Sequence, residues 1–255
     1  MEAFTTFAEK LADCAGEVLT RYFRAPLDVV SKADASPVTI ADQEAEEAMC
    51  VLIRQTYPDH GIFGEESGRS NIDATYQWVL DPIDGTRAFI AGIPTFTTLI
   101  ALCKDGVPIL GLINQPISGE RWLCTKGKSA TLNGKKIATR NTSTLAGSAI
   151  GTTSLPYYFS SDEAARFERI RQASAHVIVG GDGYGYAMVA SGQLDAFIDA
   201  CLKPYDFCAL VPVIEGAGGI ITDWQGKPLT INSKGDVLAC GNKELHTQIL
   251  RILND

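Results

Sequence analysis

Two aspartates lie three residues apart where an apolar stretch ends, in the segment Trp78-Val79-Leu80-Asp81-Pro82-Ile83-Asp84-Gly85-Thr86. The apolar stretch predicts a strand, and Pro82, which has no N–H, is expected to end its regular pairing. Gly85 allows backbone conformations that other residues avoid, so Asp81, Asp84 and the carbonyl of Ile83 can face one point. Oxygen ligands at that density suit Mg²⁺ or Mn²⁺. The same residue types also form plain turns, which is the alternative for this segment taken alone.

Acidic residues recur at the ends of two other predicted elements. Glu65 lies in Gly64-Glu65-Glu66-Ser67, just after the apolar pair Ile62-Phe63, and Asp206 follows Lys203-Pro204-Tyr205 before a helix. This recurrence favours a metal site over a turn. The chain has only three histidines, and its seven cysteines include no C-x-x-C pair. The chain therefore has few residues that could form a zinc site or a Ser-His-Asp relay, and carboxylates must carry the chemistry.

The hydrophobic pattern predicts the elements that position these carboxylates. Apolar residues at helical spacing indicate a helix over residues 4–23. A second helix is expected from about Thr39 to Tyr57, because Thr39 can cap it, Asp42 suits its first turn and Pro58 follows its end. An antiparallel sheet follows, with strands at residues 78–80, 98–102, 107–113 and 121–124 and a turn at 132–135.

The second half of the chain alternates between apolar strands and helical stretches. The strands are expected at residues 177–179, 194–198 and 220–221, and the helices at 162–174, 183–191, 206–216 and 242–253. Such alternation is typical of a layered α/β arrangement. We therefore predict two halves: residues 1–140, an α+β half with the antiparallel sheet and most metal ligands, and residues 141–255, an α/β half that supplies the last metal aspartate and substrate contacts.

Composition narrows the classes of function. The 255 residues are 45% hydrophobic and 20% charged, which is ordinary for a folded, soluble protein. The net charge is −8 and no Lys/Arg run exceeds Lys135-Lys136, so a nucleic-acid partner is not expected. No window is apolar enough to predict a membrane span, and the first residues do not resemble a secretion signal, so we expect a cytoplasmic protein.

In combination and in this order, the motifs resemble those of the inositol-monophosphatase-like metal-dependent phosphatases. The markers are Gly64-Glu65-Glu66-Ser67, Asp81-Pro82-Ile83-Asp84-Gly85-Thr86 with Phe89 following, Asp206 before Ala209, and Glu215-Gly216-Ala217-Gly218-Gly219. The resemblance covers nearly the whole chain. It implies a layered α/β fold, the αβαβα sandwich of the inositol monophosphatase and fructose-1,6-bisphosphatase type, and a homodimer.

The resemblance also implies a role for each site residue. Glu65, Asp81 and the Ile83 carbonyl would hold one Mg²⁺, and Asp81, Asp84 and Asp206 a second, with two or three ions in all and Mn²⁺ as a substitute. Glu65 and Thr86 would orient and deprotonate the attacking water. Asp42, with Lys32 nearby, would tune the groups that surround the metal ligands. Gly85 and Thr86 would offer N–H groups to the phosphate. Divalent ions suit this reaction, since phosphate monoesters need accelerations of up to about 10²¹-fold.

Within this superfamily, four segments resemble the histidinol-phosphate phosphatases. They are residues 84–90, residues 92–96, Gly181-Asp182-Gly183-Tyr184 and Leu202-Lys203-Pro204-Tyr205-Asp206. Two positions depart from expectation. Thr97 replaces a glycine of this subgroup, and Tyr205 replaces the tryptophan that usually precedes the last metal aspartate.

Histidinol phosphate carries an ammonium group and an imidazole, which would gain from carboxylates at the pocket rim. Asp182 and Asp199 are the candidates. Each has an equally good structural explanation, Asp182 as a helix cap and Asp199 as a turn at a strand end. Arg87 is equally open: it could clamp the phosphate, pair with Asp182, or only tie down its loop.

We therefore expect Mg²⁺-dependent hydrolysis of L-histidinol phosphate to L-histidinol and phosphate, a step in histidine biosynthesis. Hydrolysis of inositol 1-phosphate is the first alternative. Bisphosphate nucleotides rank third, because they would need more positive charge than the sequence offers. A regulatory binding protein that keeps the fold without its chemistry is an alternative from another class. Against it, every expected metal carboxylate is present.

Overall fold

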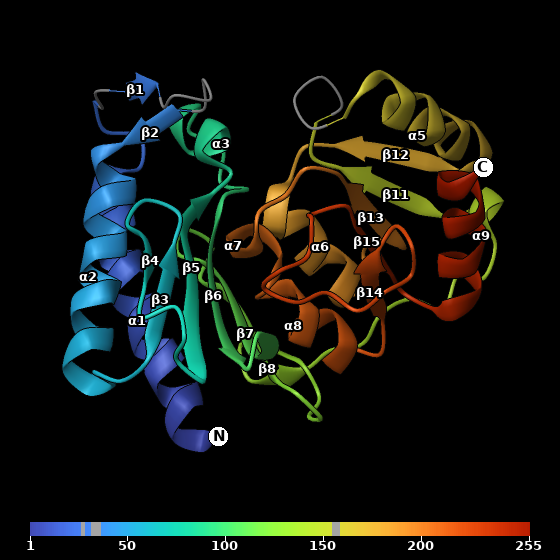
Figure 1. Cartoon of the computed structure of the whole chain (residues 1–255). Helices are drawn as coiled ribbons and strands as arrows, with labels where there is room; N and C mark the ends of the chain where they lie inside the picture. Colours follow the sequence, from blue (N-terminus) through green and yellow to red (C-terminus); the bar gives the residue numbers. More distant parts are fainter. Residues whose placement is uncertain (27–28, 32–36, 155–158) are drawn as a thin grey trace.

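The computed structural model describes residues 1–26, 29–31, 37–154 and 159–255, which form five layers of helices and sheets (Figure 1). The outer layer of the N-terminal half contains α1 (Glu2–Tyr22) and α2 (Ile40–Thr56). The middle layer contains α6 (Asp182–Ala190), α7 (Pro204–Phe207) and α8 (Leu210–Gly216), and the far outer layer contains α5 (Ser161–Ala173) and α9 (Lys243–Asn254). A sheet separates each pair of helical layers, so the expected αβαβα arrangement is confirmed.

The larger sheet has eight strands in the order β10-β9-β8-β7-β6-β5-β3-β4. Their bounds are β3 Gly61–Gly64, β4 Gly68–Ser70, β5 Tyr76–Asp84, β6 Thr97–Lys104, β7 Val107–Gln115, β8 Glu120–Thr125, β9 Thr131–Leu132 and β10 Lys135–Lys136. All neighbouring pairs are antiparallel except β3 and β5, which are parallel. The expected antiparallel sheet is therefore confirmed, while β3 and β4 were not predicted.

The smaller sheet has five strands in the order β12-β11-β13-β15-β14. Their bounds are β11 Ala149–Thr152, β12 His176–Val179, β13 Ala196–Asp199, β14 Ile220–Asp223 and β15 Val237–Cys240. The sequence interpretation missed β11 and β15. It also expected one helix over residues 206–216, where the structure has α7 and α8 with a break at residues 208–209.

Smaller elements complete the described chain. They are β1 (Val29–Ser31) and β2 (Pro37–Thr39), which pair with each other, α3 (Thr86–Ile90) and the 3-10 turn η1 (Leu145–Gly147). The two larger sheets lie within residues 61–136 and 149–240 respectively. The division into two domains at residue 140 stays a prediction.

Helix α2 begins as its sequence predicts. The Thr39 hydroxyl accepts a hydrogen bond from the Ala41 N–H at 3.2 Å, and the Asp42 carboxylate accepts one from the Thr39 N–H at 2.8 Å. This reciprocal capping satisfies backbone donors that have no partner inside the helix. It also places Asp42 in the first turn, buried against the sheet.

Apolar side chains between the layers form three buried clusters. One lies between α1, α2 and the larger sheet, a second between the two sheets, and a third against α5 and α9. The second contains Val79 and Leu99 from the larger sheet and Phe197 from the smaller one, so it joins the halves. Across the described residues, no helix combines the length and apolarity that a membrane span requires.

Candidate active site

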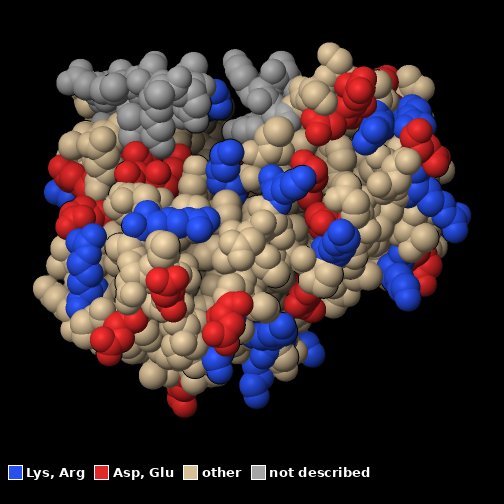
Figure 2. All heavy atoms as spheres, viewed as in Figure 1, with Lys and Arg blue, Asp and Glu red and all other residues tan. Residues whose placement is uncertain are grey.

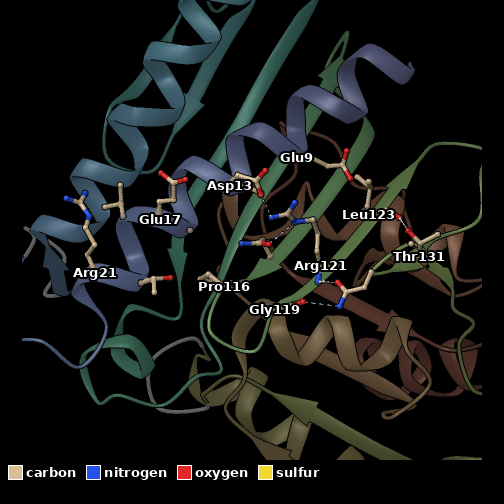
Figure 3. A pocket seen from close by; sticks show the side chains of 16 residues that line it. Glu9, Asp13, Glu17, Arg21, Pro116, Gly119, Arg121, Leu123 and Thr131 are labelled. Carbon is tan, nitrogen blue, oxygen red and sulfur yellow. Dashed lines mark hydrogen bonds and ion pairs between the residues drawn. The ribbon is translucent and has the colours of Figure 1, made fainter.

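Two large hollows mark the surface of the described chain. One, of about 1150 Å³, lies between α1 and the strands β7 and β8 (Figure 3). In this hollow Arg121 donates to Asp13 at 2.7 Å and to Asn114 at 2.9 Å. The other, of about 660 Å³, is lined by Glu65, Asp81, Asp84 and Asp206. We place the active site in the smaller hollow, because these four carboxylates line it and do not line the larger one.

Strand β5 supplies Asp81 and Asp84, but its pairing does not end at Pro82 as the sequence suggested. The strand continues to Asp84, with a register irregularity between Asp81, opposite Leu99, and Asp84, opposite Thr97. Pro82 is accommodated because its carbonyl still accepts a hydrogen bond, from the Thr98 hydroxyl at 2.9 Å. Gly85 follows with φ +90°, a conformation that glycine adopts without strain. The chain then enters α3.

Glu65 reaches the same place from β3. This strand runs parallel to β5, with Gly64 opposite Leu80, and the Glu65 N–H donates to the Leu80 carbonyl at 3.2 Å. The first residue after β3 therefore lies beside Asp81, which directly follows Leu80. The parallel pairing of two strand ends explains why acidic residues about 16 positions apart line one pocket.

Asp206 comes from the short helix α7 in the other half of the chain. Its carboxylate accepts a hydrogen bond from the Lys203 N–H at 2.6 Å, which fixes it at the start of the helix. The preceding Tyr205 packs edge-on against Phe63 with ring centroids 5.8 Å apart, and the Arg69 guanidinium covers Phe63 at 3.8 Å. Tyrosine thus provides an aromatic anchor beside Asp206 where the resemblance led us to expect tryptophan.

Three of these carboxylates form a cluster with the chemistry of a metal site. One ligand oxygen from each of Asp81, Asp84 and Asp206 lies within 4.8 Å of the other two. One oxygen of Asp81 is buried and has no hydrogen-bond partner within the described chain. A buried acceptor without a partner is costly unless something positively charged approaches it. The residues present therefore fit a divalent cation held by oxygen ligands.

The pKa values of the clustered aspartates also favour a bound cation. Burial, followed by the charge of Glu65, raises the pKa of Asp81 well above its usual value. Burial and the charge of Asp182 do the same to the pKa of Asp84, and burial raises the pKa of Asp206 to about 7. Like charges at these distances disfavour ionisation, whereas a bound divalent cation favours it. Without a cation the carboxylates of the cluster therefore repel one another, and a bound cation would offset that repulsion.

Several neighbours hold the cluster in position. Asp84 accepts hydrogen bonds from the Gly183 N–H and from the Thr97 hydroxyl, the latter at 3.3 Å. Thr97, where a glycine was expected, therefore contacts a candidate metal ligand. The Thr86 hydroxyl donates to the Ile83 carbonyl at 3.1 Å, which leaves that oxygen a second lone pair. Gly85 and Thr86 also begin α3, whose first N–H groups have no partner inside the helix.

Asp42 lies behind the cluster and does not line the pocket. One of its oxygens is bound by the Thr39 N–H and hydroxyl, while the other is buried without a partner in the described chain. Burial raises the pKa of Asp42 to about 6, and the charge of Glu65 contributes. This position fits an indirect role better than direct contact with substrate. Lys32, named with it from the resemblance, lies outside the described residues.

Asp182 lines the pocket beside Asp84, since the N–H of the next residue, Gly183, donates to the Asp84 carboxylate. It is the first residue of α6 after the N-cap Gly181, and its φ is +46°. Its carboxylate does not cap the helix, so the structural alternative to ligand contact is wrong. Burial raises its pKa to about 6, and the nearby Arg87 guanidinium opposes the rise. Arg87 is exposed and lines the same pocket.

Asp199 does not line the pocket of about 660 Å³; it lines a small cavity of about 40 Å³ that it shares with Asp84, Asp182 and Asp206. Its side chain is completely buried, and its two oxygens accept hydrogen bonds from the Thr152 hydroxyl, the Thr153 N–H and hydroxyl, and the Tyr186 hydroxyl, at 2.8 to 3.1 Å. Burial raises its pKa to about 7. With four donors already bound, Asp199 ties β13 to β11 and α6.

Comparison with known proteins agrees with this geometry. Residues 1–255 match the model of the inositol monophosphatase family. The chain belongs to the inositol monophosphatase family. It is 48% identical over 262 residues to the bifunctional phosphatase IMPL2, chloroplastic, of Arabidopsis thaliana, covering 99% of this chain and 75% of that protein. It is 36% identical over 233 residues to a histidinol-phosphatase of Chlorobaculum parvum, covering 91% and 90%.

A solved structure of an inositol monophosphatase from Zymomonas mobilis has the same fold. It superposes with a TM-score of 0.91 at 46% identity, covering 100% of this chain and 98% of that one. Family and relatives together support a metal-dependent phosphatase acting on small phosphate monoesters.

The inositol monophosphatase fold also brings to the site residues that sequence reasoning missed. Apolar side chains line part of the pocket and form what we call its apolar wall: Ile93, Ile178, Val179, Met188, Leu194 and Phe197. Apolar residues of the core and of a pocket wall share one pattern, so no sequence signal distinguished them. The other missed residue is Glu46, a buried carboxylate on α2 whose partners lie next to Glu65. Its burial became visible only in the fold.

Proposed function

We propose that this phosphatase hydrolyses L-histidinol phosphate to L-histidinol and phosphate with Mg²⁺ at the carboxylate cluster. The observation that carries the proposal is the composition of the pocket. The pocket combines the acidic cluster, Asp182 beside Asp84, and an apolar wall. A phosphate ester whose far end bears both a cation and a flat, partly apolar ring complements such a pocket.

The catalytic roles that we propose are those that the family resemblance implies. Asp81, Asp84, Asp206, Glu65 and the Ile83 carbonyl would hold Mg²⁺, two or three ions in all, with Mn²⁺ as a substitute. When bound, the ions supply positive charge that neutralises the phosphoryl group and lowers the pKa of the attacking water.

Around this centre, the chain's own groups handle the proton and the phosphate. Glu65 takes a proton from the attacking water at its carboxylate, and the Thr86 hydroxyl orients that water. The N–H groups of Gly85 and Thr86 donate to phosphate oxygens. Asp42 would influence the reaction through Glu65, since the charge of Glu65 adds to the rise that burial causes in the pKa of Asp42.

Substrate choice would depend on Asp182 and the apolar wall. With a pKa of about 6, Asp182 is ionised at about pH 8 and can accept a hydrogen bond from an ammonium group. Arg87 beside it would contact the phosphate or steady Asp182. Ile178 and Val179, which are exposed at the wall, offer a surface for an imidazole but little to a ring of hydroxyls. The Chlorobaculum parvum relative is named a histidinol-phosphatase.

A substrate ranking tests the proposal. With Mg²⁺, the purified protein should release phosphate from histidinol phosphate far faster than from inositol 1-phosphate. Asp182→Asn should lower kcat/KM for histidinol phosphate by about 10- to 100-fold, since a hydrogen bond to a charged group contributes about 1.5–3 kcal/mol. The same change should leave inositol 1-phosphate within about threefold. Asp59→Asn, at an exposed loop, is the matched control. The reverse substrate ranking would reject the assignment.

Inositol 1-phosphate hydrolysis is the alternative, and the Zymomonas mobilis structure, titled an inositol monophosphatase, favours it. The same assay decides between the two substrates. A regulatory binding role is disfavoured by the retained carboxylates, and turnover that depends on Asp84 would exclude a purely binding function. Figure 2 shows acidic and basic side chains interspersed over the face it presents. A homodimer in the cytoplasm that acts on neither nucleic acid nor membranes completes the proposal.

A further inference from the structure

A buried carboxylate on α2 accepts hydrogen bonds from the backbone that directly follows Glu65. Glu46 is 1% exposed. Its two oxygens accept hydrogen bonds from the Glu66 N–H at 2.9 Å and from the Ser67 N–H at 2.6 Å. Among the described residues it has no ion-pair partner, so these amides are what satisfy the buried charge. Hydrogen bonds from N–H groups to a charged acceptor are about twice as strong as neutral ones.

These contacts fix Glu65 from its C-terminal side. On its N-terminal side, β3 pairs with β5, and the Glu65 N–H donates to the carbonyl of Leu80, the residue before Asp81. The next two N–H groups along the chain are those held by Glu46. The backbone of Glu65 is therefore held on both sides, and its distance from Asp81 is set by two elements, β5 and α2.

Gly64 permits this approach. A Cβ at position 64 would overlap the Glu46 carboxylate and come within 2.7 Å of the Ser67 hydroxyl oxygen. A side chain there would displace the Glu46 carboxylate or the Ser67 hydroxyl from its present position. The glycine that precedes Glu65 is thus explained by contact with Glu46, since its own φ lies outside the left-handed region.

The same face of α2 carries further contacts to this segment. Asp42 and Cys50 lie four residues before and after Glu46, one helical turn away on either side. The Cys50 thiol lies 3.8 Å from the Ser67 hydroxyl, and the pKa of Asp42 is raised by burial, with a smaller contribution from the charge of Glu65. One face of α2 therefore follows the whole Glu65–Ser67 segment, with Glu46 as its central contact.

We propose that Glu46 is a positioning residue that holds Glu65 beside Asp81 through the amides of Glu66 and Ser67. The proposal rests on the proposed function, in which Glu65 binds metal and takes the proton. Glu46 itself touches neither the metal nor substrate. Groups that orient metal ligands from behind typically account for 10- to 100-fold in metal affinity or activity.

The principal test is Glu46→Gln, which keeps the size of the side chain but replaces one acceptor oxygen by an NH₂ group. One of the two amides then faces a donor instead of an acceptor. We expect kcat or the Mg²⁺ affinity measured by calorimetry to fall by about 10- to 100-fold, with KM for the ester within about threefold. Glu46→Asp, which keeps both oxygens on a shorter stem, should recover part of the loss. The matched control is Glu47→Gln, an exposed neighbour paired with Arg54.

Gly64→Ala tests the same contact from the loop side and covers the case in which glutamine at position 46 prevents folding. It should reproduce the loss of Mg²⁺ affinity or kcat. On a Glu46→Ala background it should cost much less than in the parent protein, because the clashing carboxylate is gone. If the losses of Mg²⁺ affinity or kcat caused by the two substitutions simply add, the shared contact is contradicted.

The outcomes separate this inference from the proposed function. A parent protein without Mg²⁺-dependent phosphate release would reject the proposed function. An active parent with folded Glu46→Gln and Gly64→Ala variants that keep full Mg²⁺ affinity and kcat would reject only the positioning role. A loss of thermal stability in these variants without any change in Mg²⁺ affinity or kcat would assign Glu46 to the scaffold.

Discussion

Asp81 should destabilise the metal-free protein, because its buried charge repels two others. Ligand oxygens of Asp81, Asp84 and Asp206 lie within 4.8 Å of one another, and two unit charges at that distance repel by about 3.5 kcal/mol at an effective dielectric constant near 20. Protonation relieves part of this repulsion, as the raised pKa values show. Asp81→Asn keeps the shape and removes one charge. We expect it to stabilise the metal-free fold by about 3 kcal/mol at about pH 8.

Urea unfolding followed by circular dichroism, in EDTA, measures this difference. At about pH 4 the gap between variant and parent should close, because the parent's Asp81 then takes up a proton. With Mg²⁺ at about one thousand times the dissociation constant the order should reverse, since the parent then gains about 4.1 kcal/mol from binding the ion. Asp59→Asn controls for the loss of an exposed charge. A variant no more stable than its parent in EDTA at about pH 8 would refute the electrostatic reasoning.

Three further outcomes are expected. Asp84→Asn should abolish phosphate release while the circular dichroism spectrum stays that of the parent, and residual turnover near the parental rate would contradict its role as a ligand. Glu65→Gln should lower kcat by about 10²- to 10⁴-fold in a saturating assay, as expected for a lost general base, with little change in KM. The metal-free protein should lose stability as pH rises from about 4 to about 7 in thermal melts. Burial raises the pKa of Asp42 to about 6 and of Asp199 to about 7, so the folded state holds protons that the unfolded chain releases near pH 4. A stability that increases over this range would contradict the burial of these groups.

Local signals in the sequence pointed to Asp81 and Asp84 as a carboxylate pair, because both lie on one segment. That Glu65 and Asp206 join them was implied by the family resemblance, since β3, which precedes Glu65, was not predicted. The cap at Thr39 was likewise predictable, because capping depends on residues within one turn. Such features need no knowledge of the distant chain.

The departures from expectation have long-range causes. Asp199 was expected at the rim, yet its partners Thr152, Thr153 and Tyr186 come from β11 and α6, and β11 was not predicted. Pro82 was expected to stop β5, but the Thr98 hydroxyl on the neighbouring strand bridges the irregularity. Glu46 was not singled out from the sequence, because its role depends on two amides that the fold brings against it. Burial of a polar side chain depends on partners that a single helix or strand does not reveal.

Calorimetric titration of Mg²⁺ into the purified protein tests the central claim most directly. The claim is that Asp81, Asp84 and Asp206 hold a divalent ion. The account predicts saturable uptake by the parent and none by Asp84→Asn under the same conditions. Absence of uptake by the folded parent, or equal uptake by the variant, would contradict it.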